Sequence, residues 1–317
     1  MDIISPKHRS YTMEITFLGT SGCVPTETRN LSSVLVSYLN QPYLFDCGEG
    51  TQRQMRLAGV NFMRIDHIFL THLHADHFLG LGGLIQSMDF MERTRPLNIY
   101  GPRGTEQTVN TLLSAGTFIL DHLTVDIHEA EPGLVLAGDT STISCAKTIH
   151  TAHSLAYCFE EKPHRKFLKQ KALSLGIPEG KLFSQLQDGK SVTVKGKTFT
   201  PDDVLDSPIA GRKVVYTGDT RPCASVVKLA ENADVLIHDG TFSHEEKELV
   251  EESAHTTNVQ AAEIAKKASV KKLYLTHISQ RYPKQEDLDK ILGEARKIFK
   301  ETYIAEDLQK IEIPKHW

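Results

Sequence analysis

The sequence of residues 71–77, Thr-His-Leu-His-Ala-Asp-His, limits the fold most, because four candidate metal ligands stand within six residues. Residues 67–70, His-Ile-Phe-Leu, come directly before it and indicate a buried β-strand. Side chains two residues apart in an extended segment point to the same side, so the first two histidines can bind one ion. Asp76 and His77 belong to the turn that follows and can bind a second ion nearby. These donors suit zinc, with manganese as an alternative.

A site for two ions needs more ligands than this heptapeptide supplies. Further candidates stand next to strand-like apolar segments later in the chain. An isolated residue of this kind is more often an ordinary turn residue, and a surface loop rich in histidine is the alternative interpretation. Ligand atoms at four separate strand ends favour a metal site instead. The further candidates are Asp219, His277, His150 and His153.

The composition restricts the class of protein. With 317 residues and a hydrophobic fraction of 40%, the chain can bury a sizeable core, and its net charge is −4. No segment approaches the roughly 20 apolar residues that cross a membrane, and the N-terminus lacks the apolar core of a signal peptide. The five cysteines are odd in number and widely spread, which fits a reduced compartment. We therefore expect a cytoplasmic protein without membrane segments.

Strand-like and helical segments follow a polar N-terminal extension, residues 1–12. Early strands pair as hairpins and later strands alternate with helices, which predicts an α/β (α+β) fold for residues 13–317, with sheets between layers of helices. The predicted strands are residues 13–18, 33–39, 43–45, 67–70, 97–100, 124–127, 142–146, 155–159, 213–216, 235–238 and 272–275. The predicted helices are residues 52–58, 78–91, 105–115, 224–230, 258–268 and 286–301.

One basic segment departs from this pattern. Residues 162–199 contain nine basic side chains and two acidic ones, a charge of +7 in a chain whose total is −4. Such asymmetry indicates an inserted arm that meets a polyanion while the remainder stays acidic. A solvated insertion without a partner is the alternative interpretation.

Several motifs together resemble those of one enzyme family, and the likeness covers nearly everything from Met13 onward. The chain resembles ribonuclease Z in its short form, a family of tRNA 3′-processing endonucleases within the metallo-β-lactamase superfamily. This resemblance implies an αββα sandwich with a binuclear site at the sheet edges. The motifs are Ile15-Thr16-Phe17-Leu18-Gly19-Thr20, Phe45-Asp46-Cys47-Gly48-Glu49-Gly50-Thr51, His72-Leu73-His74-Ala75-Asp76-His77 and Tyr274-Leu275-Thr276-His277-Ile278-Ser279.

The resemblance implies two Zn²⁺ per subunit and a ligand set. It assigns one ion to His72, His74 and His150, the other to Asp76, His77 and His277, with Asp219 as the bridge. His150 is preferred to His153 because the family places its histidine seven residues before a tyrosine, as His150 stands before Tyr157. Asp46 is expected to orient ligands through hydrogen bonds.

The resemblance also implies three catalytic residues. Asp76 takes the general-base role. His255, in Ala254-His255-Thr256-Thr257, resembles the histidine of the family's His-Ser-Thr motif, which supplies a proton to the leaving ribose oxygen or stabilises it. Asp239 is the expected partner that orients His255. It stands where the family commonly has glutamate, a departure that shortens the side chain by one methylene.

The family removes 3′ trailers from precursor tRNA, leaving a 3′-hydroxyl on the tRNA and a 5′-phosphate on the trailer. The resemblance therefore implies that residues 162–199 form an exosite for precursor tRNA and that the protein is a homodimer. Two alternatives stay open, a hydrolase of small phosphodiesters, thioesters or lactams, and a non-catalytic RNA-binding protein. The candidate phosphate contacts in the arm are Lys162, Arg165, Lys166 and Lys181.

Overall fold

The computed structural model describes residues 12–117 and 119–316, which form two compact units. The larger unit contains the described residues up to 160 and residues 213–314, and the smaller unit contains residues 161–212 with residues 315 and 316. The predicted N-terminal extension lies outside the described residues except for Thr12. Among the described residues, no helix combines the length and the apolar character needed to pass through a lipid bilayer.

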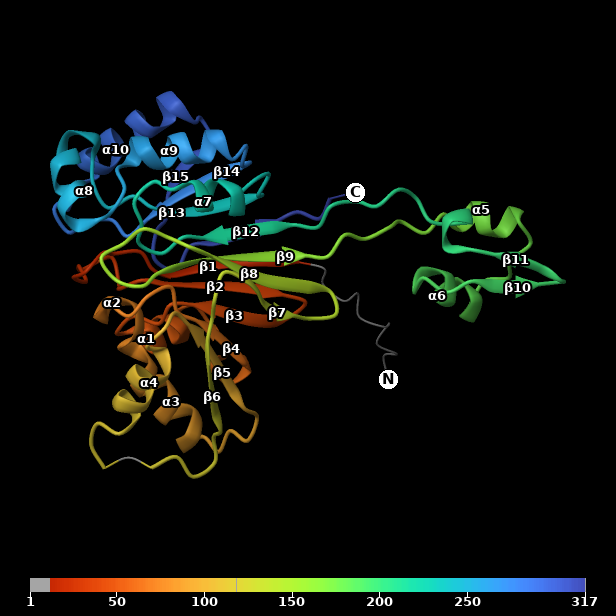
Figure 1. The fold of residues 1–317 in the computed structure, drawn as a ribbon, viewed down its shortest axis with the longest axis horizontal. Helices are drawn as coiled ribbons and strands as arrows, with labels where there is room; N and C mark the ends of the chain where they lie inside the picture. The colour runs from red at the N-terminus through yellow and green to blue at the C-terminus, as the bar shows by residue number, and fades with distance from the viewer. Residues whose placement is uncertain (1–11, 118, 317) are drawn as a thin grey trace, which may run out of the picture. The chain divides into compact units, whose positions relative to one another are not determined.

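The larger unit consists of two seven-stranded sheets packed face to face, with helices on both outer faces (Figure 1). The predicted αββα sandwich is therefore confirmed. The first sheet has the order β16 (Lys310–Ile313), β1 (Met13–Gly19), β2 (Ser33–Tyr38), β3 (Gln41–Phe45), β4 (His67–Phe69), β5 (Leu97–Gly101) and β6 (Val125–Glu129). The second has the order β15 (Thr302–Ile304), β14 (Lys272–Thr276), β13 (Val235–Asp239), β12 (Lys213–Tyr216), β9 (Leu155–Glu161), β8 (Ser141–Lys147) and β7 (Gly133–Ala137).

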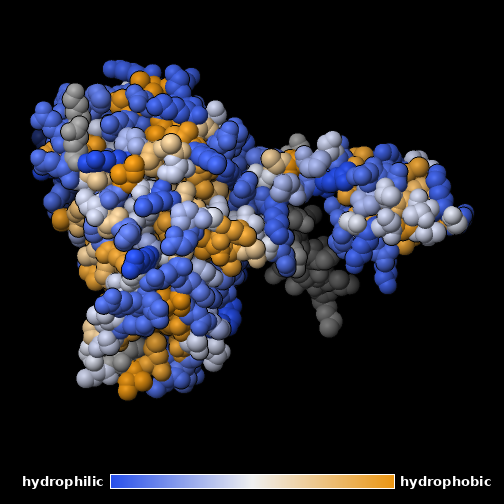
Figure 2. All heavy atoms as spheres, in the orientation of Figure 1, coloured by the Kyte–Doolittle hydropathy of each residue, from blue (hydrophilic) through white to orange (hydrophobic). Residues whose placement is uncertain are grey.

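Alternating side chains explain why each strand packs on both of its faces. In β1, Phe17 belongs to the core between the sheets, whereas Leu18 belongs to the core beneath the helices. Aromatic rings fill much of the space between the sheets. The ring centroids of Phe69 and Tyr157, for example, lie 5.5 Å apart there. In Figure 2, hydrophilic side chains predominate on the visible face and apolar atoms come in scattered groups.

The helices cover the two outer faces and bury the outward-facing strand residues. The first sheet packs against α1 (Thr51–Leu57), α3 (Gly80–Phe90) and α4 (Thr105–Leu113), and the second against α7 (Ala224–Leu229), α9 (Asn258–Lys267) and α10 (Gln285–Ile298). The short helices α2 (Ala75–Phe78) and α8 (Lys247–Ser253) lie in connections. A capping box of Thr257 and Gln260 starts α9, which fixes the residues just before it.

Parallel pairing brings strand ends to common edges. In the first sheet β4 is parallel to β3 and β5, and in the second β13 is parallel to β12 and β14. The loops that leave the carboxyl ends of these strands therefore meet at one edge of each sheet, where α/β folds commonly bind ligands. Each predicted ligand segment is one of these loops or the connection between β8 and β9.

The smaller unit has its own apolar core. It contains α5 (Lys169–Ser174), α6 (Lys181–Gln187) and the hairpin of β10 (Val192–Val194) and β11 (Lys197–Phe199). Its boundary is wider than the predicted segment of residues 162–199. Residues 161–212 carry ten basic and six acidic side chains, so their charge is +4 rather than the +7 of the narrower segment. The buried residues are Ala172, Ile177, Leu186, Val192, Phe199 and Val204.

A buried ion pair joins the two ends of the smaller unit. Arg212 Nε lies 2.8 Å from Glu161 Oε2, and Arg212 Nη2 lies 3.2 Å from Glu161 Oε1. The two side chains are only 1% and 6% exposed. A hydrogen-bonded pair of this kind compensates charges that would be costly to bury alone.

The predicted segments differ from the structure at some places. The predicted helix over residues 78–91 is divided into α2 and α3 at Leu79, and the helix predicted to reach residue 301 ends at Ile298, because Phe299 is extended. Several short or exposed elements were not predicted, since they offer little hydrophobic periodicity. These are β7, β10, β11, β15, β16, α5, α6 and α8.

We expect Arg212→Met to destabilise the smaller unit by about 3–5 kcal/mol, because it removes the guanidinium that pairs with the buried Glu161 carboxylate. Hydrogen exchange of the backbone amides in α6, β10 and β11 measures this change. The control is Arg165→Met, whose partner Asp202 is 84% exposed, and a much smaller effect is expected there. Equal exchange rates in the two variants would contradict the expected role of the pair.

Candidate metal centre

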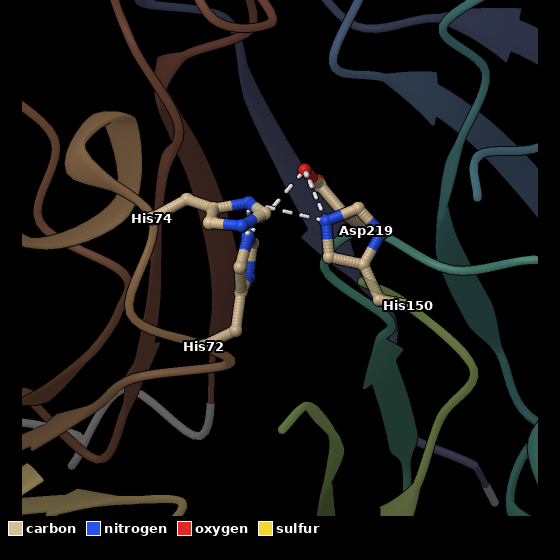
Figure 3. A group of neighbouring side chains, drawn as sticks. All are labelled: His72, His74, His150 and Asp219. Atoms are coloured by element: carbon tan, nitrogen blue, oxygen red, sulfur yellow. Dashed lines mark hydrogen bonds and ion pairs between the residues drawn. The ribbon is translucent and has the colours of Figure 1, made fainter. Parts of the chain in front are cut away.

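The predicted ligands converge at the edge of the larger unit from both sheets. His72 and His74 follow β4, Asp219 follows β12, His277 follows β14, and His150 lies between β8 and β9. Figure 3 shows the imidazoles of His72 and His74 on one side, facing His150 and Asp219 on the other. Residues separated by up to about two hundred positions in the chain thus share one pocket.

The first group contains three histidines and one carboxylate. One ligand atom from each of its members lies within 4.8 Å of the others. His72 Nε2 and His150 Nε2 lie 3.0 Å and 3.2 Å from His74 Nδ1. Asp219 Oδ2 lies 3.6 Å from His72 Nε2 and 3.9 Å from His150 Nε2. The structure thus places His150 in this group, whereas His153 is exposed and does not belong to it.

The second group contains two carboxylates and two histidines, and it shares Asp219 with the first. His77 Nε2 lies 3.5 Å from Asp76 Oδ2 and 3.3 Å from Asp219 Oδ2. His277 Nε2 lies 3.2 Å from each of the same two oxygens. The Asp219 carboxylate faces both groups and is the one residue that these two groups share.

The donors in this pocket fit a divalent metal ion. Within the part of the chain that the structure describes, His77 Nε2 and Asp219 Oδ1 are buried without a hydrogen bond. A buried polar atom without a hydrogen bond is costly, and two such atoms in one cluster indicate an electrophile that would satisfy both. Imidazole nitrogens and carboxylate oxygens at this spacing are the ligands that zinc and similar divalent ions take.

The protonation states also suit metal binding. Burial lowers the pKa of His72 well below its ordinary value, and burial likewise lowers the pKa values of His74 and His150. These histidines are therefore neutral, which is the form that binds a metal ion. The first group thus offers three neutral imidazoles to an ion.

The second group favours positive charge. Burial opposes a charge on His77, but Asp219 and Asp46 outweigh it and raise the pKa of His77 well above its ordinary value. Burial also opposes ionisation of Asp76 and Asp219, yet the histidines around them lower the pKa of both carboxyl groups. The two carboxylates are therefore ionised and would stabilise a cation placed between them.

Asp46 holds the ligands in place from behind. This buried residue has a left-handed backbone, with φ of 56°. Its Oδ2 accepts hydrogen bonds from His77 Nδ1 at 2.7 Å and from the Tyr216 hydroxyl at 2.9 Å, and its Oδ1 accepts one from the Thr71 amide at 2.7 Å. The bond to Nδ1 fixes the His77 ring so that Nε2 faces the pocket. The role of Tyr216 is not evident from the sequence, because this residue ends an apolar strand and looks like part of the core.

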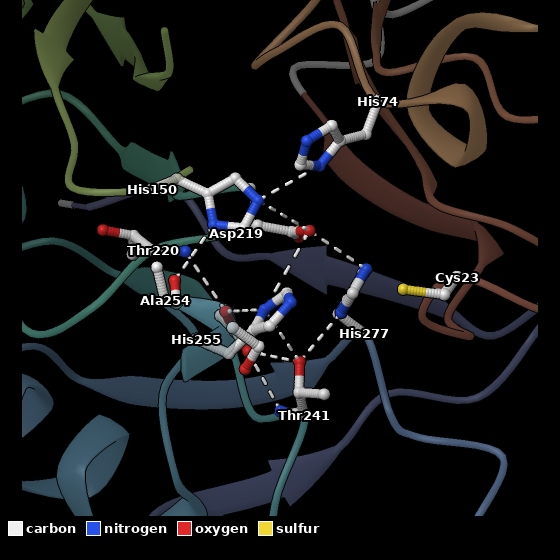
Figure 4. A network of polar contacts seen from close by, with 12 residues as sticks. Cys23, His74, His150, Asp219, Thr220, Thr241, Ala254, His255 and His277 are labelled. Atoms are coloured by element: carbon white, nitrogen blue, oxygen red, sulfur yellow. Dashed lines mark hydrogen bonds and ion pairs between the residues drawn. The ribbon is translucent and has the colours of Figure 1, made fainter. Parts of the chain in front are cut away.

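His255 lies beside the two groups (Figure 4) and forms a second histidine–carboxylate pair with Asp239. His255 Nδ1 lies 2.8 Å from Asp239 Oδ2, so the shorter aspartate side chain reaches the imidazole. Burial opposes a charge on His255, but Asp239 outweighs it and raises the pKa of His255 to about 9. The centroid of the His255 ring lies 5.0 Å from that of the His277 ring. Thr241 Oγ1, also not predicted, lies 2.8 Å from His277 Nδ1.

The backbone next to His255 also contacts the first group. His150 Nδ1 donates a hydrogen bond to the carbonyl oxygen of Ala254 at 3.0 Å. This bond leaves Nε2 of His150 facing the pocket. The sequence could not have shown it, because a carbonyl oxygen carries no residue-specific signal.

The predicted phosphate contacts lie in the smaller unit, and they differ in availability. Lys162, Lys166 and Lys181 are exposed. Arg165 instead pairs with Asp202 at 2.6 Å and donates to the carbonyl oxygen of Asp206 at 2.7 Å. Its guanidinium is thus engaged within the unit, and the three lysines are the stronger candidates.

Comparison with known proteins places the chain among metal-dependent hydrolases. A family model described as beta-lactamase superfamily domain matches residues 195–278, and one described as anti-Pycsar protein Apyc1 matches residues 13–164. The chain is 46% identical to ribonuclease Z of Methanothermobacter thermautotrophicus, over 95% of this chain and 97% of the relative. It is 47% identical to ribonuclease Z of Archaeoglobus fulgidus, over 95% of this chain and 97% of that relative. The crystal structure of the short form of human tRNase Z superimposes with a TM-score of 0.70 at 26% identity, over 95% of this chain and 100% of that chain.

We expect Asp46→Asn to weaken zinc binding by about 10–100-fold, because the amide replaces an acceptor by a donor toward His77 Nδ1. Competition with a chromophoric zinc chelator measures this affinity. The control is Asp126→Asn, which removes an exposed carboxylate from β6 and should leave the affinity unchanged. Wild-type zinc affinity in Asp46→Asn would show that Asp46 does not orient the ligands.

Proposed function

The chain belongs to the ribonuclease Z family, and we propose that it is an endoribonuclease that removes 3′ trailers from precursor tRNA. The observation that carries this proposal is the high identity to ribonucleases Z over nearly the whole chain, together with the two buried ligand groups. The products would be a tRNA with a 3′-hydroxyl and a trailer with a 5′-phosphate.

The proposed centre holds two zinc ions per subunit, with manganese as an alternative. His72, His74 and His150 would hold one ion, Asp76, His77 and His277 would hold the other, and Asp219 would bridge them. When bound, two such ions lower the pKa of a water molecule and screen the charge of the scissile phosphate. The division of the donors into two groups that share Asp219 supports this arrangement.

The chain's own residues would move the protons of the hydrolysis. The Asp76 carboxylate is ionised and can accept a proton from the attacking water. As the oxygen of that water bonds to phosphorus, the bond from phosphorus to the ribose O3′ breaks. His255 donates through Nδ1 to Asp239, so its Nε2 can give a proton to the leaving O3′. Asp239 would act as the residue that orients this imidazole.

The smaller unit is proposed to bind the substrate away from the chemistry. Its exposed lysines Lys162, Lys166 and Lys181 can contact phosphates, and such contacts recognise RNA by its shape. We further propose a cytoplasmic homodimer, in which the arm formed by residues 161–212 presents tRNA to the site of the other subunit. The positive charge of this arm, in a chain whose net charge is negative, supports the proposal that the arm binds RNA.

Purified protein incubated with zinc and a trailer-bearing precursor tRNA should release one discrete trailer with a 5′-phosphate. Mapping both product ends on a sequencing gel measures this outcome. His74→Ala and Asp76→Ala should each lower the rate by at least about 100-fold, because each removes a ligand. Asp126→Asn, at an exposed position of β6, serves as the control. Full activity in either ligand variant, or no discrete trailer from the wild-type protein, would contradict the proposal.

The triple variant Lys162→Ala, Lys166→Ala and Lys181→Ala should raise the KM for precursor tRNA and reduce the dependence of binding on salt. Each lost phosphate contact lowers the slope of log affinity against log salt by roughly 0.7–0.9. Turnover of bis-p-nitrophenyl phosphate, which is too small to reach an exosite, should not change. The matched control removes three exposed lysines of the larger unit, Lys266, Lys267 and Lys300. Equal KM values in the two triple variants would exclude these lysines as substrate contacts.

A further inference from the structure

The loop from Thr20 to Asn30, between β1 and β2, lies against the second ligand group although it contributes no ligand. The backbone amide of Cys23 donates a hydrogen bond to Asp76 Oδ2 at 2.9 Å. Cys23 has a left-handed backbone, with φ of 56°, a conformation that few residues other than glycine, asparagine and aspartate adopt readily. Figure 4 shows Cys23 next to His277 at the edge of the pocket. The loop thus fixes one oxygen of a ligand through a main-chain donor.

The same loop packs against the second ligand of that group. A Cβ atom on Gly22 would lie 2.5 Å from His277 Nδ1 and 2.9 Å from the His277 carbonyl oxygen, so only glycine fits there. Gly22 donates its amide to the carbonyl oxygen of Ile278 at 3.2 Å, and Ile278 donates to that of Thr20 at 2.9 Å. His277 itself is left-handed, with φ of 60°. These contacts hold a ligand whose backbone conformation is otherwise unfavourable.

The loop is in turn fixed to the C-terminal part of the larger unit. The Asp307 carboxylate accepts hydrogen bonds from Thr20 Oγ1 at 2.8 Å and from the backbone amide of Asn30 at 2.6 Å. Arg29 Nη1 donates to Thr20 Oγ1 at 2.7 Å and to the carbonyl oxygen of Ala305 at 2.6 Å. Both ends of the loop are therefore held to the C-terminal part of the larger unit.

We propose that Gly22 and Cys23 are positioning residues which decide whether the second ligand group retains its ion. They act through Asp76 and His277, and the Cys23 thiol has no part in this role. In the part of the chain that the structure describes, no hydrogen bond joins this loop to His72, His74 or His150, so the first group keeps its affinity when the loop is disturbed. This inference rests on the two-ion centre of the proposed function.

The experiment compares zinc binding in pairs of variants. Gly22→Ala introduces the clash with His277. Its matched control is Gly83→Ala in α3, where the added Cβ meets its nearest neighbour at an ordinary 3.6 Å. Cys23→Pro removes the amide donor and excludes the left-handed backbone. Its matched control is Cys23→Asn, which keeps the amide and tolerates this backbone.

Metal content after dialysis, chelator competition at graded zinc concentrations and thermal unfolding are measured for each variant. Gly22→Ala and Cys23→Pro should bind one zinc ion like the wild-type protein and the second at least about 10-fold more weakly. Gly83→Ala and Cys23→Asn should bind both ions normally. Excess zinc should restore cleavage in the two affected variants, which would not follow from a lost catalytic group.

Wild-type affinity for both ions in Gly22→Ala and Cys23→Pro would overturn the inference, as would equal loss in Cys23→Asn. Should Gly22→Ala fail to fold, the two Cys23 variants decide, because that residue is exposed and lies outside the core. A wild-type protein that binds fewer than two ions would instead refute the two-ion centre, and the role of the loop would fall with it.

Discussion

The buried carboxylate of Asp46 joins the two sheets at the edge where the ligands meet. It follows β3 of the first sheet and accepts the hydroxyl of Tyr216, which lies in β12 of the second. The same carboxylate accepts hydrogen bonds from His77 and from the Thr71 amide. An unpaired charge at this depth would be strongly unfavourable, so these donors must all be present together. The geometry of the centre therefore depends on correct packing of both sheets.

The ligand groups concentrate ionisable residues of opposite charge that stabilise one another. Asp76 and Asp219 face the same two histidines, and both carboxyl groups are ionised. Asp219 faces both groups, so its carboxylate is common to the two ligand sets. The loop with Gly22 and Cys23, by contrast, acts on the second group through Asp76 and His277.

Local sequence was sufficient to predict most of the fold and the ligand segments. The short apolar run before His72 indicated a buried strand, and the sandwich of helices and sheets followed from the order of elements. The contact of Gly22 with His277 and the donor from Cys23 to Asp76 could not be predicted, because they join segments more than fifty residues apart through backbone atoms. The wider boundary of the smaller unit escaped prediction for a related reason, since Glu161 and Arg212 pair across fifty-one positions.

The smaller unit has an apolar core of its own, closed by the Glu161–Arg212 pair and separate from the three cores of the larger unit. Substitutions on its surface can therefore accumulate without disturbing the stability of the sandwich. Over evolutionary time, such an insertion could diversify in sequence and length while the chemistry of the scaffold stayed the same.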